Sequence, residues 1–250
     1  MTAIRLIVDP ADVDGDRATI RGAELRYLGR VRRARPGEIV EMLDGAGRLF
    51  RGVIERIGRS EATIRDVRAA AEPPRASVTL ALGLGRTEPL DRAVRAASEL
   101  GADRIVALRT DRSLRRQAAA ERSLVERWRR IALEGLRSSG NARPARIEGP
   151  LDPAEWFDKL DGTAPGARAR LLFDAGGEPV HAAIARLRPG ADGWVLLLGP
   201  EGGLDEAETA AAVSCRFTAV SLWRGNLRVE TAVTAAVAVV RAVADNPPEG

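Results

Sequence analysis

The spacing of the apolar positions predicts two different structures in the two parts of the chain. Before residue 72, short segments that alternate apolar and polar residues end at glycine turns such as Asp44-Gly-Ala-Gly47. Alternation at a period of two is typical of half-buried strands, and a series of short strands predicts a small β-barrel over residues 1–72. One short helix is expected at residues 24–33, where apolar residues recur at helical spacing. The strands are expected at residues 4–8, 18–21, 39–43, 48–57 and 62–67.

The pattern changes after the linker Glu72-Pro-Pro-Arg75, whose consecutive prolines continue neither a helix nor a sheet. Short apolar runs then predict buried strands, and the segments between them carry apolar residues at helical spacing. This alternation predicts an α/β domain over residues 76–246, with a mainly parallel sheet and helices on both faces. Strands are expected at residues 77–82, 104–108, 170–173, 194–198 and 218–222. Helices are expected at residues 88–100, 118–137, 153–160, 179–187, 205–214 and 230–244.

Two loops in this domain combine glycine with a following helix start. The run Trp194–Leu198 ends at Gly199-Pro200, and Gly202-Gly203 permit close backbone approaches that a β-carbon blocks. Asp205 then opens a helix with acids in its first turn, which suits the positive end of the helix dipole. Residues 221–232 repeat this arrangement at the next strand. Because ligands of open α/β folds bind at the carboxyl ends of strands, the two loops predict one pocket.

Composition excludes several kinds of site. The 250 residues are 45% hydrophobic, which is ample for a core. No apolar run reaches membrane-spanning length and the amino terminus lacks a signal-peptide core, so a soluble cytoplasmic protein is expected. Cys215 is the only cysteine and His181 the only histidine, which argues against a disulfide within the chain and against a metal site. We expect Cys215 to be a small buried residue and His181 to lie at the surface or in packing.

The net charge of +4 is modest, but the positive charge is clustered. Residues 21–35 hold six arginines against one acid, and residues 109–130 hold eight arginines against three acids. Clustered arginine is the electrostatic footprint of a nucleic-acid binder. The clusters also have a simpler explanation, because Lys159 is the only lysine and arginine is the default cation of this chain.

The last expected helix, residues 230–244, is apolar almost all round. Such a helix is buried on most of its sides. Its many alanines permit close approach either to the core of the same chain or to the equivalent helix of a second subunit. The sequence leaves core burial and dimerisation as equal alternatives.

Two motifs in the glycine loops resemble those of a known family. The motifs are Leu196-Leu-Leu-Gly-Pro-Glu-Gly-Gly-Leu204 and Leu227-Arg-Val-Glu-Thr-Ala232. They resemble the SPOUT RNA methyltransferases and, more narrowly, the RsmE-type 16S ribosomal RNA uracil-N3 methyltransferases. Tyr27-Leu-Gly-Arg-Val-Arg-Arg33 and Leu43-Asp-Gly-Ala-Gly47 are similar to the PUA-like β-barrel that precedes the SPOUT domain in that family. The resemblance covers residues 4–244.

The resemblance implies a methyltransferase that holds S-adenosylmethionine in a trefoil knot at the carboxyl end of the parallel sheet. It also implies a homodimer whose substrate is one uridine, methylated at N3, in 16S ribosomal RNA of the 30S subunit. No metal and no membrane are expected to take part. Most of the expected cofactor contacts are made by backbone groups, which is why the loops contain glycine. The residues expected at the cofactor are Leu198, Gly199, Pro200, Glu201, Gly202, Gly203, Leu222, Trp223, Asn226, Leu227, Thr231 and Ala232.

Arg228 and Glu230 are the candidate catalytic residues. Uracil N3 carries a proton near neutral pH, so its methylation needs that proton removed or the resulting negative charge stabilised. Arg228 is expected to stabilise that charge on the base or its carbonyls. Glu230 is either a proton acceptor or, at a helix start, a cap or an ion-pair partner of Arg228. Glu201 is expected to organise its loop rather than to act as a base.

The arginine clusters form the expected RNA-binding surface, where guanidinium groups contact phosphates without reading sequence. Trp223 either stacks on an unpaired or flipped base beside the cofactor loops or packs in the core. The residues expected to contact RNA are Arg30, Arg32, Arg33, Arg112, Arg115, Arg116, Arg129 and Arg130.

Three segments depart from the family pattern. Arg95-Ala96 stands where the family has Gln-Lys, Arg137–Asn141 differs from Glu-Gln-Ser-Gly-Arg, and Gly225 occupies the place of an arginine. These departures motivate a second hypothesis, in which an inactive relative binds RNA or assists ribosome assembly. A third hypothesis, a nucleotide- or phosphate-binding enzyme, has less support because neither Gly-x-Gly-x-x-Gly nor a Gly-Lys-Ser/Thr P-loop occurs.

Overall fold

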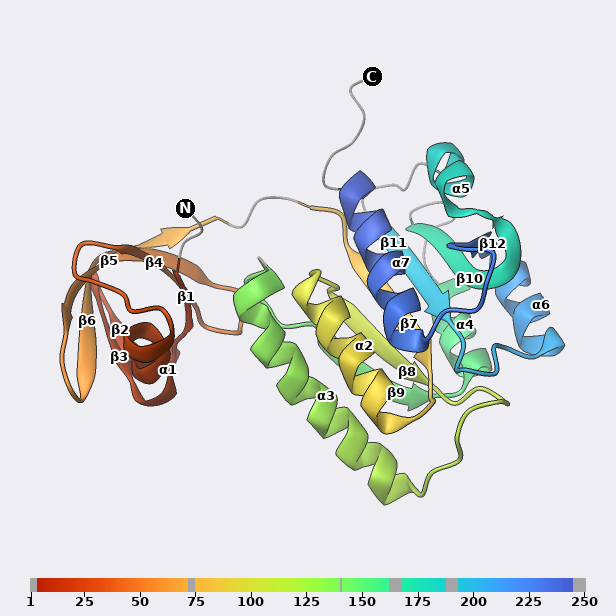
Figure 1. Ribbon diagram of the computed structural model, residues 1–250, viewed down its shortest axis with the longest axis horizontal. Coiled ribbons are helices and arrows are strands. Elements are labelled where there is room, and N and C mark those ends of the chain that lie inside the picture. Colours follow the sequence, from red (N-terminus) through yellow and green to blue (C-terminus); the bar gives the residue numbers. More distant parts are fainter. Residues whose placement is uncertain (1–3, 72–74, 140, 162–167, 188–192, 245–250) are drawn as a thin grey trace. The chain divides into compact units, whose positions relative to one another are not determined.

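The structure, a computed structural model, divides the chain into two compact units (Figure 1). The first unit comprises residues 1–74 with 140–144, and the second comprises residues 75–139 with 145–250. The linker prolines, Gly140 and the outermost residues of both expected domains lie outside the described residues. The described residues are 4–71, 75–139, 141–161, 168–187 and 193–244.

The first unit is a six-stranded sheet of order β1-β4-β5-β6-β3-β2, in which only the β1–β4 pair is parallel. A helical segment follows β3, with α1 (Gly22–Arg26) running into the π-helical turn η2 (Tyr27–Val31). Leu28 of this segment is fully buried in the core of the sheet. The strands are β1 (Ile4–Ile7), β2 (Val13–Asp14), β3 (Arg17–Arg21), β4 (Ile39–Leu43), β5 (Leu49–Ile57) and β6 (Glu61–Ala70), with a short 3-10 turn at Pro10–Asp12.

The described residues show the predicted β-barrel in part. No ladder joins β1 to β2, so the sheet remains a curled half-barrel with two edges. The physical reason is the length of β2, whose two residues pair only with β3 and offer little edge for closure. The helical segment α1–η2 instead contributes Leu28 to the core that the curled sheet surrounds.

The second unit has a six-stranded sheet of order β12-β10-β11-β7-β8-β9, and every pair in it is parallel. This confirms the predicted parallel sheet. The strands lie at β7 (Val78–Gly83), β8 (Arg104–Leu108), β9 (Arg146–Leu151), β10 (Arg168–Pro179), β11 (Gly193–Leu198) and β12 (Thr218–Ser221).

Helices cover both faces of this sheet. Alternate residues of β11 enter two separate cores, with Leu196 on the face that carries α2, α3, α5 and α7 and Leu197 on the face that carries α4 and α6. Within the described ranges, every helix is too short or too polar to cross a membrane. The helices are α2 (Thr87–Glu99), α3 (Ala118–Ser139), α4 (Pro153–Asp161), α5 (Val180–Arg186), α6 (Glu206–Ser214) and α7 (Val229–Ala244).

The sequence pattern missed strand β9. Its residues include Gly149-Pro150, and a proline interrupts the strand pattern because it cannot donate a ladder hydrogen bond. The proline is accommodated because β9 lies at the edge of the sheet and pairs only with β8, with a shift in register between Val106 and Leu108. An edge strand tolerates this residue where a central strand does not.

Candidate functional site

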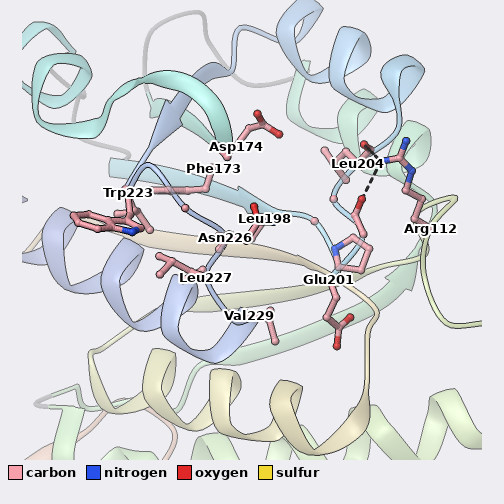
Figure 2. Close-up of a pocket in the computed structure, with 18 of the residues that line it drawn as sticks. Arg112, Phe173, Asp174, Leu198, Glu201, Leu204, Trp223, Asn226, Leu227 and Val229 are labelled. Atoms are coloured by element: carbon pink, nitrogen blue, oxygen red, sulfur yellow. Dashed lines mark hydrogen bonds between the residues drawn. The ribbon is translucent and has the colours of Figure 1, made fainter.

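The two glycine loops follow strands β11 and β12 at their carboxyl ends, and β10 lies between these two strands in the sheet. Together they enclose a cavity of about 380 Å³, here named the donor cavity (Figure 2). Its lining residues are Arg112, Phe173, Asp174, Ala175, Leu198, Gly199, Pro200, Glu201, Gly202, Gly203, Leu204, Val220, Leu222, Trp223, Gly225, Asn226, Leu227, Val229 and Ala232.

The turn Gly199–Gly203 is folded so tightly that glycine is required at its ends. The Gly203 amide donates to the Pro200 carbonyl at 2.8 Å, and Gly203 has a φ of +72°, in the left-handed region. A β-carbon at Gly199 would lie 2.8 Å from the carbonyl carbon of Gly203, which is closer than van der Waals contact allows. The turn therefore presents backbone to the donor cavity on a surface that side chains would otherwise fill.

Side chains from neighbouring loops hold this turn in place. Arg112 Nη1, from the loop after β8, donates to the Gly202 and Leu204 carbonyls at 2.9 and 3.1 Å. The Glu201 carboxylate accepts from the amide of Arg86, in the loop before α2, at 3.2 Å. Glu201 thus contacts another loop, as expected of an organising residue. The shape of the donor cavity depends on contacts between segments that are far apart in sequence.

The start of α6 is tied to the loop after β8 as well. Asp205 and Glu208 form a capping box, in which the Asp205 carboxylate accepts from the Glu208 amide at 2.7 Å. The Glu208 carboxylate completes the box, because its Oε2 accepts from the Asp205 amide at 3.0 Å. Its other oxygen, Oε1, accepts from the Asp111 amide at 2.8 Å. The acids predicted to suit the helix dipole therefore also fix the loop that carries Arg112.

The second loop carries an exposed indole beside a glycine. Trp223 is 66% exposed, which excludes the core role that the sequence left open for it. A β-carbon at Gly225 would lie 3.2 Å from Trp223 Nε1, so the indole occupies the space beside this glycine. The departure at Gly225 therefore goes together with the tryptophan, since a long side chain at this position would displace the ring.

A second hollow of about 500 Å³, here named the arginine hollow, adjoins the donor cavity. It lies at the amino ends of α2 and α7, and both candidate catalytic residues line it. Arg112, Glu201, Gly202 and Val229 contribute to the lining of both spaces, so the two are separated only by the glycine turn and its neighbours. The arginine hollow is lined by Arg86, Pro89, Arg112, Leu114, Glu201, Gly202, Arg228, Val229 and Glu230.

Glu230 is an ion-pair partner in this hollow, and its partner is Arg92 rather than Arg228. Arg92 Nη2 donates to Glu230 Oε1 at 3.1 Å. The pKa of the Glu230 carboxyl lies below its ordinary value, because its own backbone amide and the Arg92 guanidinium stabilise the charged form more than partial burial opposes it. A carboxylate with a lowered pKa is a weak proton acceptor, so the geometry favours the ion-pair role of Glu230.

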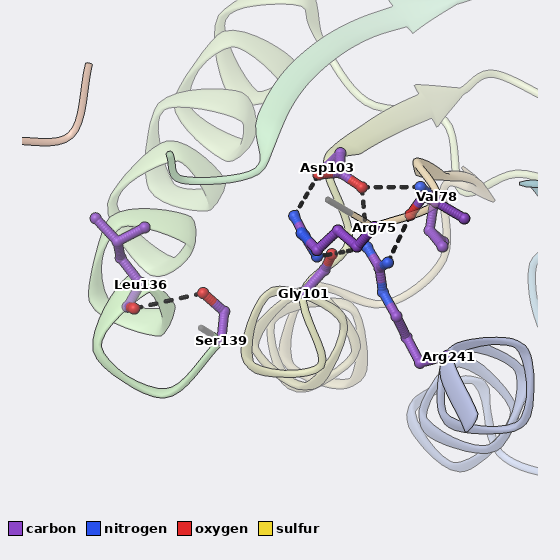
Figure 3. Close-up of polar contacts among 8 residues, drawn as sticks. Arg75, Val78, Gly101, Asp103, Leu136, Ser139 and Arg241 are labelled. Atoms are coloured by element: carbon purple, nitrogen blue, oxygen red, sulfur yellow. Dashed lines mark hydrogen bonds and ion pairs between the residues drawn. The ribbon is translucent and has the colours of Figure 1, made fainter. Parts of the chain in front are cut away.

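The carboxyl-terminal end of α7 is fixed by a buried guanidinium (Figure 3). Arg241 donates to the Ala76 carbonyl at 2.6 Å and to Asp103 Oδ2 at 2.9 Å, and it also bonds the Gly101 carbonyl. Asp103 Oδ2 accepts from the Val78 amide at 2.8 Å. Helix α7 is thus tied at its carboxyl end to the start of β7 and the turn before β8. Glu230 lies in its first turn, and Arg228 directly precedes it.

All but one of the predicted cofactor residues line the donor cavity. Thr231 does not, because it is exposed on α7 and lies between the lining positions Val229 and Ala232. Strand β10 also reaches the cavity, through Phe173, Asp174 and Ala175, which were not among the predicted residues. A signal was present, because glycines 176 and 177 follow directly and make a third glycine-rich strand end.

The predicted RNA-binding arginines fall into two groups. Arg112 and Arg116 form hydrogen bonds within the second unit, since Arg116 bonds the Gly85 carbonyl and Arg112 holds the glycine turn. Arg129 pairs with Glu126 on the same helix. The others are exposed and form no ion pair with another described residue: Arg30, Arg32, Arg33, Arg115 and Arg130. Among the described residues, no group of three or more His, Cys, Asp or Glu side chains is placed to hold a metal ion.

Comparison with known proteins identifies the family. Residues 71–241 match the RNA methyltransferase domain, and residues 20–67 match the RNA methyltransferase PUA domain. The ribosomal RNA small subunit methyltransferase E of Mycobacterium bovis is 32% identical over 244 residues, which are 96% of this chain and 92% of that protein. The chain belongs to the ribosomal RNA small subunit methyltransferase E family. This confirms the resemblance drawn from the glycine loops and the PUA-like character of the first unit.

Two further members extend the comparison. The ribosomal RNA small subunit methyltransferase E of Synechocystis is 29% identical, with 98% of this chain and 79% of that protein covered. The crystal structure of the Neisseria gonorrhoeae enzyme bound to S-adenosyl methionine has the same fold, with a TM-score of 0.74 at 22% identity. The matched region covers 97% of this chain and 98% of the Neisseria gonorrhoeae chain.

Proposed function

We propose that this ribosomal RNA small subunit methyltransferase E family member transfers a methyl group from S-adenosylmethionine to N3 of one uridine in 16S ribosomal RNA. One observation carries the proposal beyond family membership. The two glycine loops enclose the donor cavity, and the adjoining arginine hollow presents Arg228. A transfer reaction needs two neighbouring binding spaces, one for the donor and one for the acceptor.

The donor cavity fits S-adenosylmethionine. A volume of about 380 Å³ lies in the range of small-molecule sites, and its floor of Leu198, Val220 and Val229 is apolar, as the adenine ring requires. The glycine turn presents backbone rather than side chains to the polar edge of the base and the ribose. S-adenosylmethionine supplies an electrophilic methyl group bound to a sulfonium, and the similar Neisseria gonorrhoeae structure is bound to this molecule. Positioning by the loops is then the main contribution of the protein.

Arg228 and Glu230 act on the acceptor side. Arg228 stabilises the negative charge that develops on the uracil as the N3 proton leaves. Glu230 holds Arg92 and keeps the amino end of α7 in place, and its lowered pKa makes it a positioning residue rather than the base. Thr231, outside the lining of the donor cavity, has a supporting role at the start of α7.

RNA binding is assigned to the exposed arginines of both units. Arg30 lies in the helical segment of the first unit and Arg32 and Arg33 follow it, while Arg115 and Arg130 are exposed in the second unit. Without acidic partners among the described residues, their guanidinium groups are available to phosphates. Trp223, exposed beside the donor cavity, stacks on an unpaired base. Arg112 and Arg116 support the loops on which the RNA lies.

The wider assignments follow from the same family relationship. They are a trefoil knot around the donor cavity, a homodimer, action on the 30S subunit in the cytoplasm, and domains at residues 1–72 and 76–246. The homodimer has support from α7, where Val233, Val237 and Val240 face the core while Val239 and Val243 are only partly buried. A partly buried apolar stripe is suited to a second copy of the chain.

A methyl-transfer assay tests the proposal. The protein is incubated with labelled S-adenosylmethionine and either 16S RNA or 30S subunits that lack the modification, and the modified base is mapped. Label on N3 of a single uridine is the expected result. Binding of RNA without any label would favour the second hypothesis, an inactive relative, and label on another atom or base would refute the assignment of uridine N3.

A further inference from the structure

We propose that the arginine hollow is the binding site of the target pyrimidine, with Arg86 and Leu114 as its recognition residues beside Arg228. The inference rests on the proposed function and adds a location and a means of selection. Arg86 and Leu114 are contributed by the loops after β7 and β8, whereas Arg228 comes from the loop before α7. Three loops that are distant in sequence therefore meet at one space.

The position of the hollow suits an acceptor. Gly202 and Val229 line both the hollow and the donor cavity, so a base in the hollow lies next to the donor where the two spaces meet. A volume of about 500 Å³ accommodates a pyrimidine ring with its sugar. A base reaches such a space only when it has left its stack, which agrees with recognition of an unpaired or flipped nucleotide.

Arg86 and Arg228 give the hollow its chemical preference. Both are exposed, and neither forms an ion pair within the described part of the chain. The guanidinium group only donates hydrogen bonds, so it recognises carbonyl oxygens. Uracil presents a carbonyl on each side of N3, whereas cytosine presents an amino group in place of O4. Two arginines at the hollow therefore favour uracil over cytosine.

The same arrangement stabilises the reactive form of the base. When the N3 proton leaves to solvent, the negative charge spreads over O2 and O4, where the guanidinium groups donate. The amino ends of α2 at Thr87 and α7 at Val229 add positive potential at this point.

The other charged groups of the hollow are already engaged. Glu230 is bound by Arg92, Glu201 accepts from the Arg86 amide, and Arg112 is bound to the glycine turn. Oε2 of Glu230 has no hydrogen-bond partner in the described part of the chain, and the side chains of Arg86 and Arg228 are the cations available to a ligand in this space.

Leu114 supplies an apolar surface for the ring. Its side chain is 49% exposed, although its amide is fixed by a 3.0 Å hydrogen bond to the Leu84 carbonyl. Arg116 reinforces the same segment by bonding the Gly85 carbonyl. A rigidly held, exposed leucine at the wall of a charged hollow is suited to packing against the face of a base.

Kinetics on RNA that contains uridine or 5-fluorouridine at the target position test the proposal. Fluorine makes the N3 proton more acidic, so a variant that has lost charge stabilisation recovers on this substrate. We expect Arg86→Ala to lower kcat by about 10²-fold on uridine RNA, to lose much less on 5-fluorouridine RNA, and to bind S-adenosylmethionine normally. Arg86→Lys should recover part of the loss. Leu114→Ala should raise KM for RNA by about tenfold with little change in kcat.

Arg186→Ala is the matched control, because it removes an exposed arginine of α5 that pairs with Glu178 and lies outside the arginine clusters, the donor cavity and the arginine hollow. Its kcat should equal that of the wild type on both RNAs. The inference is overturned, and the proposed function left standing, if Arg86→Ala lowers kcat equally on both RNAs. The same holds if this variant changes only KM, as expected for a general phosphate contact. A wild-type protein that methylates no uridine overturns the proposed function and this inference with it.

Discussion

Replacing Gly83 with alanine tests whether the donor cavity depends on the close approach between the end of β7 and the glycine turn. A β-carbon at Gly83 would lie 2.5 Å from Pro200 Cδ, 2.6 Å from Pro200 N and 3.0 Å from the carbonyl carbon of Gly199. These atoms belong to the backbone or to a proline ring, so none of them can rotate away. Either the turn or the end of β7 has to move.

The size of the movement sets the expected effect. Carbon atoms pack at about 3.5 Å or more, so relief of the contact requires a displacement on the order of 1 Å. Overpacking of this kind lowers the free energy of unfolding by about 1–3 kcal/mol. The same displacement misplaces the backbone groups that line the donor cavity, and we expect affinity for S-adenosylmethionine to fall at least about tenfold, or about 1.4 kcal/mol.

Tryptophan fluorescence during urea unfolding isolates the relevant unit. All four tryptophans of the chain belong to the second unit, so the emission reports that unit and not the half-barrel. Calorimetric titration with S-adenosylmethionine then gives the affinity of the folded variant. The tryptophans are Trp128, Trp156, Trp194 and Trp223.

Gly202→Ala is the control for the stability measurement. Its β-carbon would lie 3.5 Å from the Arg112 side chain, an ordinary contact, and Gly202 does not have a positive φ. We expect this variant to unfold at the wild-type urea concentration. The reasoning is refuted if Gly83→Ala matches the wild type in both stability and donor affinity, or if Gly202→Ala is destabilised equally.

Three further predictions concern α7. Arg228→Ala should lower the single-turnover rate of methylation by about 10²–10³-fold while donor affinity stays unchanged, and a wild-type rate would exclude its catalytic role. Because the folded pKa of Glu230 is lowered, its charge stabilises the fold above the ordinary pKa of 4.5, and this contribution is lost as pH falls through the lower folded value. The difference in unfolding free energy between wild type and Glu230→Gln should therefore shrink at acid pH; a constant difference would contradict the ion pair with Arg92. Arg241→Ala should cost about 1–3 kcal/mol in urea unfolding, since the Ala76 carbonyl loses its guanidinium donor while Arg75 still donates to the Gly101 carbonyl and Asp103, and wild-type stability would show that the contacts are replaceable.

The sequence predicted those parts of the fold in which a local residue pattern is compatible with a single structure. The continuous apolar run of β11 predicted a strand buried on both faces, because its side chains enter two cores in alternation. Strand β9 escaped prediction because Pro150 is acceptable only at an edge, and the edge position depends on the order of the whole sheet. The open half-barrel likewise depends on the two-residue length of β2, which no local pattern reveals.

The candidate site divides in the same way. The glycine turn was predictable because glycine itself signals close backbone approach. The contacts that hold the turn were not, because Arg112 and Gly202 are separated by 90 residues in the chain and nothing near either residue indicates the other. The exposed position of Trp223 and its link to Gly225 also required the fold, since a lone tryptophan in a loop is equally consistent with burial.

The order of strands in the second sheet has a consequence for synthesis of the protein. Strand β11 pairs with β10 on one side and with β7 on the other, although both precede it in the chain. A nascent chain therefore leaves one edge of β7 and both edges of β10 unpaired until residue 198 has been made. Exposed strand edges are templates for association with other chains, so the incomplete domain is most vulnerable to misassembly during this interval. The donor cavity arises later still, once residues 218–232 have followed, and a prematurely ended chain has no ligand site through which a cofactor could stabilise it.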